Sequence, residues 1–131
     1  MNNIFGREQK LKGKKTISEI FNGPKNSVNS FPFRAFYLIS KSDKAIAKFG
    51  ISVPKKKFRR AVDRNRIKRL VKESIRLNNS ELNQLLRNKR FTIKVMIVCN
   101  SKEMPNYSLV DVKIKEIINR LSSVVNVYEE K

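Results

Sequence analysis

The sequence predicts one mixed α/β domain whose elements follow the order α-β-β-α-β-α. Its 131 residues are enough for one modest hydrophobic core and too few for two, so residues 1–131 are interpreted as a single domain. Three stretches show the apolar alternation of strands, and three others show the apolar spacing of amphipathic helices. Residues 1–9 and 126–131 are expected to be flexible tails.

The first predicted helix covers residues 16–22. Thr16 and Glu19 have the spacing of a capping box, and a Gly-Pro pair ends the helix. The apolar residues between these signals share one helical face: Ile17, Ile20 and Phe21. A loop-like stretch rich in Asn, Ser and Pro follows over residues 25–32.

Two strands are predicted next, over residues 33–40 (FRAFYLIS) and 48–53 (KFGISV). On the first strand Arg34 and Phe36 share one face, so an aromatic ring lies beside a cation. On the second strand the small residues Gly50 and Ser52 leave one face nearly bare. If the two strands pair as a hairpin, these faces form a shallow floor on which an extended ligand can lie.

The remaining elements are a helix over residues 61–77, a strand over 90–99 and a last helix across 110–125. The connection after the first of these is polar and contains only a weak helical turn. Cys99 lies in the apolar strand, where we expect a buried, inert thiol.

The charge balance predicts a polyanionic partner. Thirty Lys and Arg against eleven Asp and Glu give a net charge of +19, and such self-repulsion opposes a compact state unless a polyanion supplies countercharge. Nucleic acid is the obvious candidate. The chain has no apolar run long enough to span a bilayer and no signal-peptide core, so a soluble, cytoplasmic protein without a membrane partner is expected.

The residue types that usually perform catalysis are scarce. The chain has no His and one Cys, which removes the commonest general base, the commonest metal ligand and thiolate clusters. Its carboxylates are scattered along the sequence, whereas two-metal hydrolysis needs several that converge. We therefore expect no catalytic residue and no metal site in the protein itself.

The strongest local feature is the basic segment over residues 55–76. It holds eleven Lys and Arg and two acids, a local net charge of +9. Such concentration favours a nucleic-acid contact over a solvated helix face, because solvated helices usually mix acids and bases at i, i+4. The predicted binding residues are Lys55, Lys56, Lys57, Arg59, Arg60, Arg64, Asn65, Arg66, Lys68, Arg69 and Lys72.

Helical geometry divides these side chains into two groups. Asn65, Lys68, Arg69 and Lys72 project to one side and form a cationic strip beside the apolar face. Arg64 projects into the apolar arc, from which it either reaches a cleft or snorkels out to water. The mixture of Arg forks, Lys point charges and an Asn amide suits RNA, although spacing alone leaves DNA open.

Residues 50–74 (GISVPKKKFRRAVDRNRIKRLVKES) closely resemble the signature region of the bacterial ribonuclease P protein family. The hallmark is Arg64-Asn65-Arg66 followed by the basic pair Lys68 and Arg69. A Gly-x-Ser-Val strand and a Lys-rich loop precede it at family spacing, and the order of elements agrees over roughly residues 10–125.

The resemblance implies an α/β (α+β) two-layer sandwich, the ribosomal protein S5 domain 2-like fold, with a left-handed βαβ crossover. General handedness rules alone favour the opposite hand. The resemblance further implies that the signature helix contacts the catalytic RNA of ribonuclease P. That RNA would perform hydrolysis with Mg²⁺, no cofactor would be bound by the protein, and no obligate protein partner would be needed.

The resemblance also implies a cleft for the single-stranded 5′ leader of precursor tRNA. By position its residues would be Ile17 and Phe21 from the first helix with Arg34 and Phe36 from the first strand. Aromatic platforms hold unpaired bases without sequence preference. Ile17 departs from the aromatic residue that many relatives carry there, and Phe21 fits a core position as well as a cleft position.

The sequence therefore predicts a ribonuclease P protein subunit that contributes binding and orientation to tRNA 5′ maturation. One rival is a structural ribosomal RNA-binding protein that does not stimulate cleavage. A second is a stand-alone metal-dependent nuclease, which the missing carboxylate cluster disfavours.

Overall fold

A computed structural model describes residues 26–128. Its elements are β1 (Ser27–Ser30), β2 (Phe33–Lys41), β3 (Ala47–Ser52), α2 (Ala61–Asn78), α3 (Ser80–Lys89), β4 (Phe91–Cys99) and α4 (Tyr107–Val127). The predicted first helix, with Ile17 and Phe21, lies outside the described residues. Helix α4 continues two residues into the stretch expected to be a tail, and Tyr128 then packs edge-on against Phe91 at a centroid distance of 5.1 Å.

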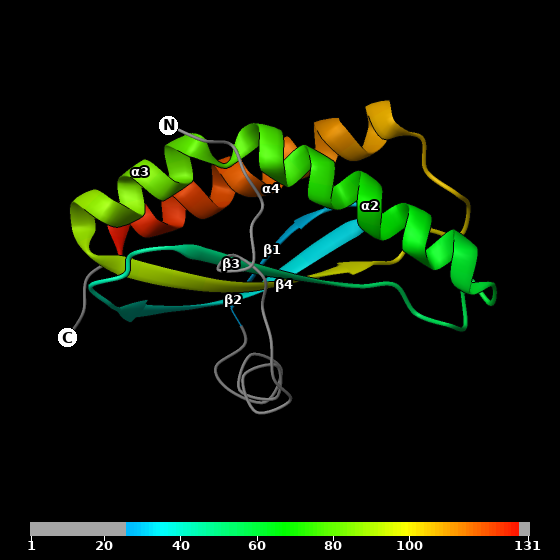
Figure 1. The fold of residues 1–131 in the computed structure, drawn as a ribbon, viewed down its shortest axis with the longest axis horizontal. Helices are drawn as coiled ribbons and strands as arrows, with labels where there is room; N and C mark the ends of the chain where they lie inside the picture. Colours follow the sequence, from blue (N-terminus) through cyan, green and yellow to red (C-terminus); the bar gives the residue numbers. More distant parts are fainter. Residues whose placement is uncertain (1–25, 129–131) are drawn as a thin grey trace.

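The fold has two layers. All three described helices cover one face of the sheet, and Figure 1 shows them together above the strands. The core lies between the layers, where Phe33 and Phe49 from the sheet and Ile67 and Ile114 from the helices are at most 1% exposed. The mixed α/β sandwich that was predicted is therefore confirmed.

The four strands follow the order β1-β2-β4-β3. β2 pairs antiparallel with both β1 and β4, whereas β3 pairs parallel with β4. The predicted hairpin between the second and third strands is therefore wrong, because β4 lies between them. The physical reason is that β4 is the most apolar strand, with Thr92 and Met96 only 5% exposed on one face and the core on the other. A strand buried on both sides belongs in the middle of a sheet.

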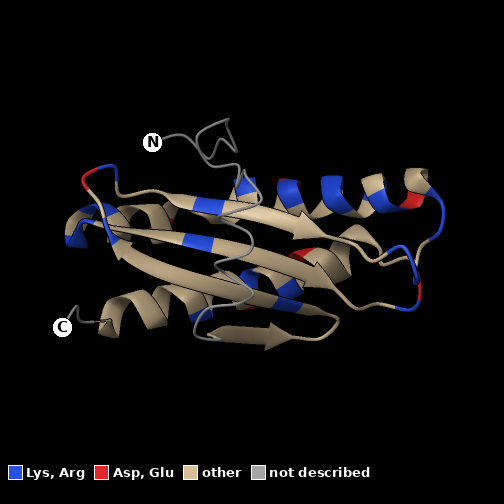
Figure 2. Ribbon diagram, turned by 90° about the horizontal axis from the view of Figure 1, so that it is seen from below, with Lys and Arg blue, Asp and Glu red and all other residues tan. Residues whose placement is uncertain are grey.

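The connection from β3 through α2 and α3 to β4 is a crossover between adjacent parallel strands. The two views in Figures 1 and 2 show that it is left-handed. This hand is rare, since about 98% of such connections are right-handed. It confirms the expectation drawn from the family resemblance.

Two elements were missed or underestimated from the sequence. Residues 27–30 form the edge strand β1 rather than a loop, and the side chains of Glu116 and Arg120 on α4 hold it through Ser30 and the Asn29 carbonyl. The weak helical turn is the ten-residue helix α3, which ends at Arg90 in the left-handed conformation. Both depend on tertiary contacts that a local pattern does not show.

The last strand and last helix agree with the sequence. Cys99 is fully buried at the end of β4, so the expected burial is confirmed, and burial raises the pKa of its thiol. Asn106 caps α4, since its side chain accepts a hydrogen bond from the Leu109 N–H at 2.9 Å. This cap fixes the start of the helix directly after Pro105.

Candidate nucleic-acid interface

A basic loop over residues 53–60 joins β3 to α2. The backbone N–H groups of Lys57 and Phe58 both donate to the Pro54 carbonyl at 3.2 Å, which closes a tight turn. The Phe58 ring is 8% exposed and anchors the loop in the core, while its neighbours Lys55, Lys56, Lys57, Arg59 and Arg60 are exposed. The buried Phe58 ring therefore anchors a loop whose five cationic side chains are exposed to solvent.

The guanidinium of Arg64 connects helix α2 to this loop. Its Nη1 donates hydrogen bonds to the carbonyl oxygens of Phe58 and Arg59, each at 2.8 Å. The side chain is half-buried, so it neither extends into an empty cleft nor simply snorkels to water. Arg64 thus orients the loop that carries the other cations.

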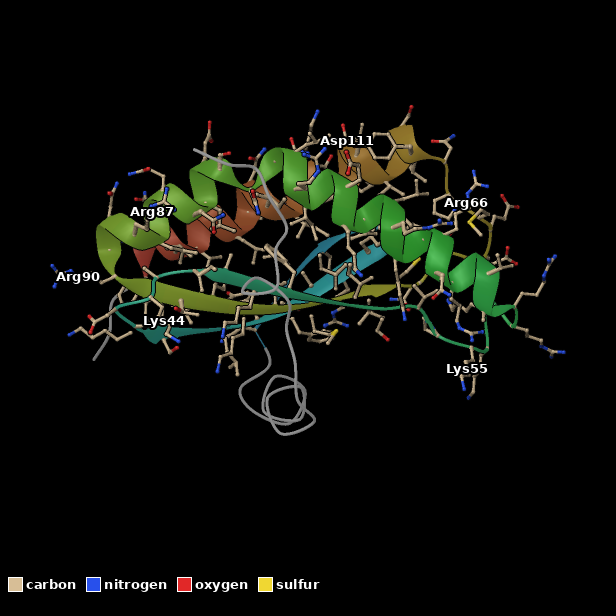
Figure 3. The ribbon with its side chains drawn as sticks, viewed as in Figure 1. Lys44, Lys55, Arg66, Arg87, Arg90 and Asp111 are labelled. Atoms are coloured by element: carbon tan, nitrogen blue, oxygen red, sulfur yellow. The ribbon has the colours of Figure 1, made fainter. Side chains whose placement is uncertain are left out.

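The predicted cationic strip lies along α2 beside that loop. Ile67, Val71 and Ile75 face the core. Of the predicted strip, Asn65 and Arg69 are exposed on the outer side, and Arg66, which was not assigned to the strip, is exposed with them. Lys68 and Lys72 are half-buried between the two faces. Figure 2 shows the blue segments repeating along α2, and in Figure 3 Arg66 points away from the sheet.

Few acids oppose these cations. Glu73 forms an ion pair with Arg76, with 2.5 Å between Arg76 Nη2 and Glu73 Oε1. The side-chain hydrogen bond from Arg76 lowers the pKa of Glu73. Across residues 26–128, none of the basic side chains from Lys55 to Arg69 forms an ion pair. From Lys55 to Arg69, the loop and strip therefore form one strongly basic surface, in which Asp63 is the one acid of the segment.

Lys57 extends this surface toward the end of β4. Its Nζ donates to the Asn100 carbonyl at 3.0 Å, which ties the basic loop to the next loop along the sheet edge. The carboxyl ends of parallel strands lie at the same edge, so β3 and β4 bring these two loops together.

Two of the four residues predicted to line the leader cleft, Arg34 and Phe36, lie on the far face of the sheet. We define the far face as the face turned away from the three described helices. Arg34 is exposed there, and its guanidinium carbon lies 4.8 Å from the centroid of the half-buried Phe36 ring. The predicted pairing of a cation with an aromatic ring is therefore present. Ile17 and Phe21 lie outside the described residues, so their place in a cleft stays a prediction.

Side chains that could ligate a metal ion do not cluster in the described part of the chain. Between residues 26 and 128, no three His, Cys, Asp or Glu side chains lie together in a way that could hold a metal ion. Over the same residues, no helix has both the length and the apolar character needed to cross a membrane.

The far face also carries charges whose grouping the sequence did not reveal. Lys48 and Lys94 are direct partners across the β3–β4 ladder. Strand parity places both on the face that includes Arg34, but their proximity depends on β4 lying beside β3. The fold and its two cationic surfaces define a small, strongly basic α/β protein.

Comparisons with known proteins identify the family. The family model for ribonuclease P matches residues 5–122. The ribonuclease P protein component of Porphyromonas gingivalis is 32% identical over 122 residues, which cover 92% of this chain and 88% of the relative. That of Clostridium acetobutylicum is 40% identical over 88 residues, covering 67% and 66% of the two chains. The Staphylococcus aureus RNase P protein shares the fold, with a TM-score of 0.65 at 18% identity over 86% of this chain and 94% of that one.

The chain therefore belongs to the ribonuclease P protein family. It is a component of the ribonuclease P enzyme complex, which acts in tRNA processing, and its family implies an RNA partner.

Proposed function

We propose that the chain binds the catalytic RNA of ribonuclease P and the 5′ leader of precursor tRNA, and so promotes RNA-catalysed removal of the leader in the cytoplasm. The observation that carries this proposal is the surface made by the basic loop and the α2 strip. Its cations lie together and are largely exposed, and from Lys55 to Arg69 they form no ion pair within residues 26–128.

This surface suits a folded RNA. Arg59, Arg60, Arg66 and Arg69 offer planar forks that match phosphate oxygens, while the lysines act as point charges. Asn65 adds an amide that can donate to or accept from a sugar or base edge. Neutralising phosphates here also lowers the repulsion between the catalytic RNA and its substrate, which are both polyanions.

The far face suits a single strand. The Phe36 ring gives a stacking platform, and the neighbouring Arg34 guanidinium adds a cation for the backbone. Stacking of one base on an aromatic side chain contributes about 1–3 kcal/mol and tolerates any sequence, as leaders of different tRNAs require. Ile17 and Phe21 would complete this cleft.

We assign the bond chemistry to the RNA and its Mg²⁺ ions. Support for this assignment comes from residues 26–128, where no three His, Cys, Asp or Glu side chains lie together in a way that could hold a metal ion. The protein's part is to bind and orient.

The test is reconstitution. The protein should stimulate cleavage of precursor tRNA at the mature 5′ end by its catalytic RNA at low Mg²⁺, and should leave the substrate intact when the RNA is omitted. Site-specific cleavage by protein alone would overturn the assignment of chemistry. A protein that binds RNA without stimulating cleavage would instead favour the structural ribosomal RNA-binding alternative.

A further inference from the structure

A second cationic site lies at the opposite end of the sheet from the basic loop. It is a cavity of about 230 Å³ lined by Lys41, Lys44, Lys48 and Lys94 together with the hydroxyl-bearing residues Ser40 and Thr92. We call it the lysine pocket. Figure 3 shows Lys44 at one end of the sheet and Lys55 at the other.

Strand pairing builds the lysine pocket on the far face. Lys48 of β3 is the direct partner of Lys94 of β4, and Ser40 of β2 is the direct partner of Thr92. Figure 2 looks onto this face and shows the two blue bands side by side on β3 and β4. The turn from β2 to β3 brings in Lys44, whose N–H donates to the Ser42 hydroxyl at 3.2 Å.

This arrangement is electrostatically unfavourable without an anion. Like charges directly opposite each other on neighbouring strands destabilise a sheet. Within residues 26–128, none of the four lysines forms an ion pair, and the nearby acid of the turn, Asp43, does not line the pocket. Four cations kept together with no carboxylate favour a ligand that brings its own negative charge.

The chemistry of the lining indicates a phosphate group. Lysine ammonium groups bind phosphate as point charges, and hydroxyl groups add hydrogen-bond donors. The Thr92 Oγ1 accepts from the Ile46 N–H at 3.4 Å, which leaves its own proton for a ligand. Among the described residues no aromatic side chain lines the pocket, so it is suited to a sugar-phosphate backbone and not to a stacked base.

The position of the pocket indicates which nucleic-acid strand would supply the phosphates. It lies on the same face as Phe36, four residues further along β2 at Ser40, a separation of about 13 Å at roughly 3.3 Å per residue. A single strand that stacks on Phe36 and continues along β2 away from the basic loop reaches the lysine pocket directly.

We propose that the lysine pocket binds backbone phosphates of the distal part of the precursor-tRNA leader, beyond the nucleotides held at Phe36. This inference rests on the proposed function, since it extends the same single-stranded site. Under this proposal the affinity for precursor tRNA depends on leader length and gains no added dependence on leader sequence.

The test uses holoenzyme reconstituted at saturating protein and a series of precursor tRNAs that differ only in leader length. The variant is Lys48→Gln combined with Lys94→Gln. The matched control is Lys102→Gln combined with Lys113→Gln, two lysines that do not line the pocket. Wild type and control should gain affinity as the leader lengthens past Phe36. The pocket variant should lose this gain, on the order of tenfold for long leaders, and bind short-leader substrates normally.

Two further readouts make the result decisive. For long leaders the slope of log affinity against log salt should become shallower by about 0.7 for each phosphate that the variant no longer neutralises. The thermal midpoint of the pocket variant should be unchanged or raised, because two like charges are removed.

Equal losses for all leaders, including mature tRNA, would overturn the proposal and place the catalytic RNA on the pocket. If the pocket variant loses affinity for no leader of any length, the proposal is also overturned. In that case, binding of short leaders that depends on Phe36 would still support the proposed function. If wild-type holoenzyme shows no response to any leader, the proposed function itself fails.

Discussion

Arg64 fixes the backbone of Phe58: the guanidinium Nη1 donates to the Phe58 carbonyl at 2.8 Å, across six positions of the chain. The same nitrogen reaches the Arg59 carbonyl. The first turn of α2 therefore holds the loop that precedes it. In the signature Arg64-Asn65-Arg66, the first arginine has an internal structural role, while the last is exposed.

This difference gives a prediction for the two arginines. Arg64→Ala should lower the free energy of unfolding by about 1.5–3 kcal/mol, because hydrogen bonds to charged groups have this magnitude. Arg66→Ala should change it by less than about 0.5 kcal/mol, as expected at an exposed site, and should make the salt slope of RNA binding shallower by about one unit. Urea unfolding and binding titrations at several salt concentrations measure both effects. Equal stability losses in the two variants would contradict the division of roles.

Phe36 should matter to substrate more than to stability. Phe36→Ala should weaken holoenzyme binding of leader-bearing precursor tRNA by about 1–3 kcal/mol and leave mature tRNA binding nearly unchanged. Its cost in unfolding free energy should stay below the ~3–5 kcal/mol typical of a fully buried Phe, which Phe33→Ala provides as a reference.

Leu38→Ala is the matched comparison for loss of apolar volume, since Leu38 lies on the same face of β2 without an aromatic ring. Because the proposed leader path passes over Leu38, the loss at Phe36 in excess of the loss at Leu38 measures the stacking. The dissociation constants of both tRNAs and the unfolding midpoints are compared for all variants. If Phe36→Ala affects both tRNAs equally and unfolds as easily as Phe33→Ala, the ring belongs to the core and the leader lies elsewhere.

Asp111 should make the domain acid-sensitive. It joins α4 to α2, because its Oδ1 accepts from Ser74 Oγ at 2.9 Å and Asn78 Nδ2 at 3.1 Å, and its Oδ2 pairs with Lys115 at 3.0 Å. Burial raises the pKa of this carboxyl, but the hydrogen bonds from Lys115, Ser74 and Asn78 outweigh it and hold the pKa below its ordinary value. The stabilisation is therefore complete above the ordinary Asp range and is lost as the pH falls through the lowered value.

Asp111→Ala should destabilise the protein by about 1–3 kcal/mol at neutral pH, since it leaves the fully buried Ser74 hydroxyl without its acceptor. The difference from wild type should shrink in acid. Urea unfolding across a pH series measures this, with Asp43→Ala in the β2–β3 turn as control. A stability difference that stays constant down to low pH would show that the charge of Asp111 contributes nothing.

The periodic elements could be predicted from the sequence because their faces are decided locally. Ile67, Val71 and Ile75 mark the buried face of α2, and the alternation in β2 separates Phe33 and Ala35 from Arg34 and Phe36. The Lys-rich loop and the α2 strip followed from charge and helical geometry alone.

Strand order could not be predicted in the same way, because pairing is decided by which strand is buried on both faces. The continuous apolar run of β4, with Met96 opposite the core face, was the available indication. Without that order, Lys48 and Lys94 stayed separate residues and the lysine pocket could not be seen. The loop bonds of Arg64 likewise depend on backbone geometry that spacing does not contain.

The central position of β4 also governs when this chain can fold during its synthesis. Within residues 26–128, β3 pairs with β4 alone, so residues 47–52 have no complete partner strand there until Cys99 has been made. The basic residues 55–72 are therefore synthesised before β4, the strand that completes this part of the sheet. Such late, non-local pairing slows folding and prolongs exposure of unpaired strands. For this protein, the sheet and core that position the basic loop are complete only once β4 and α4 have been made.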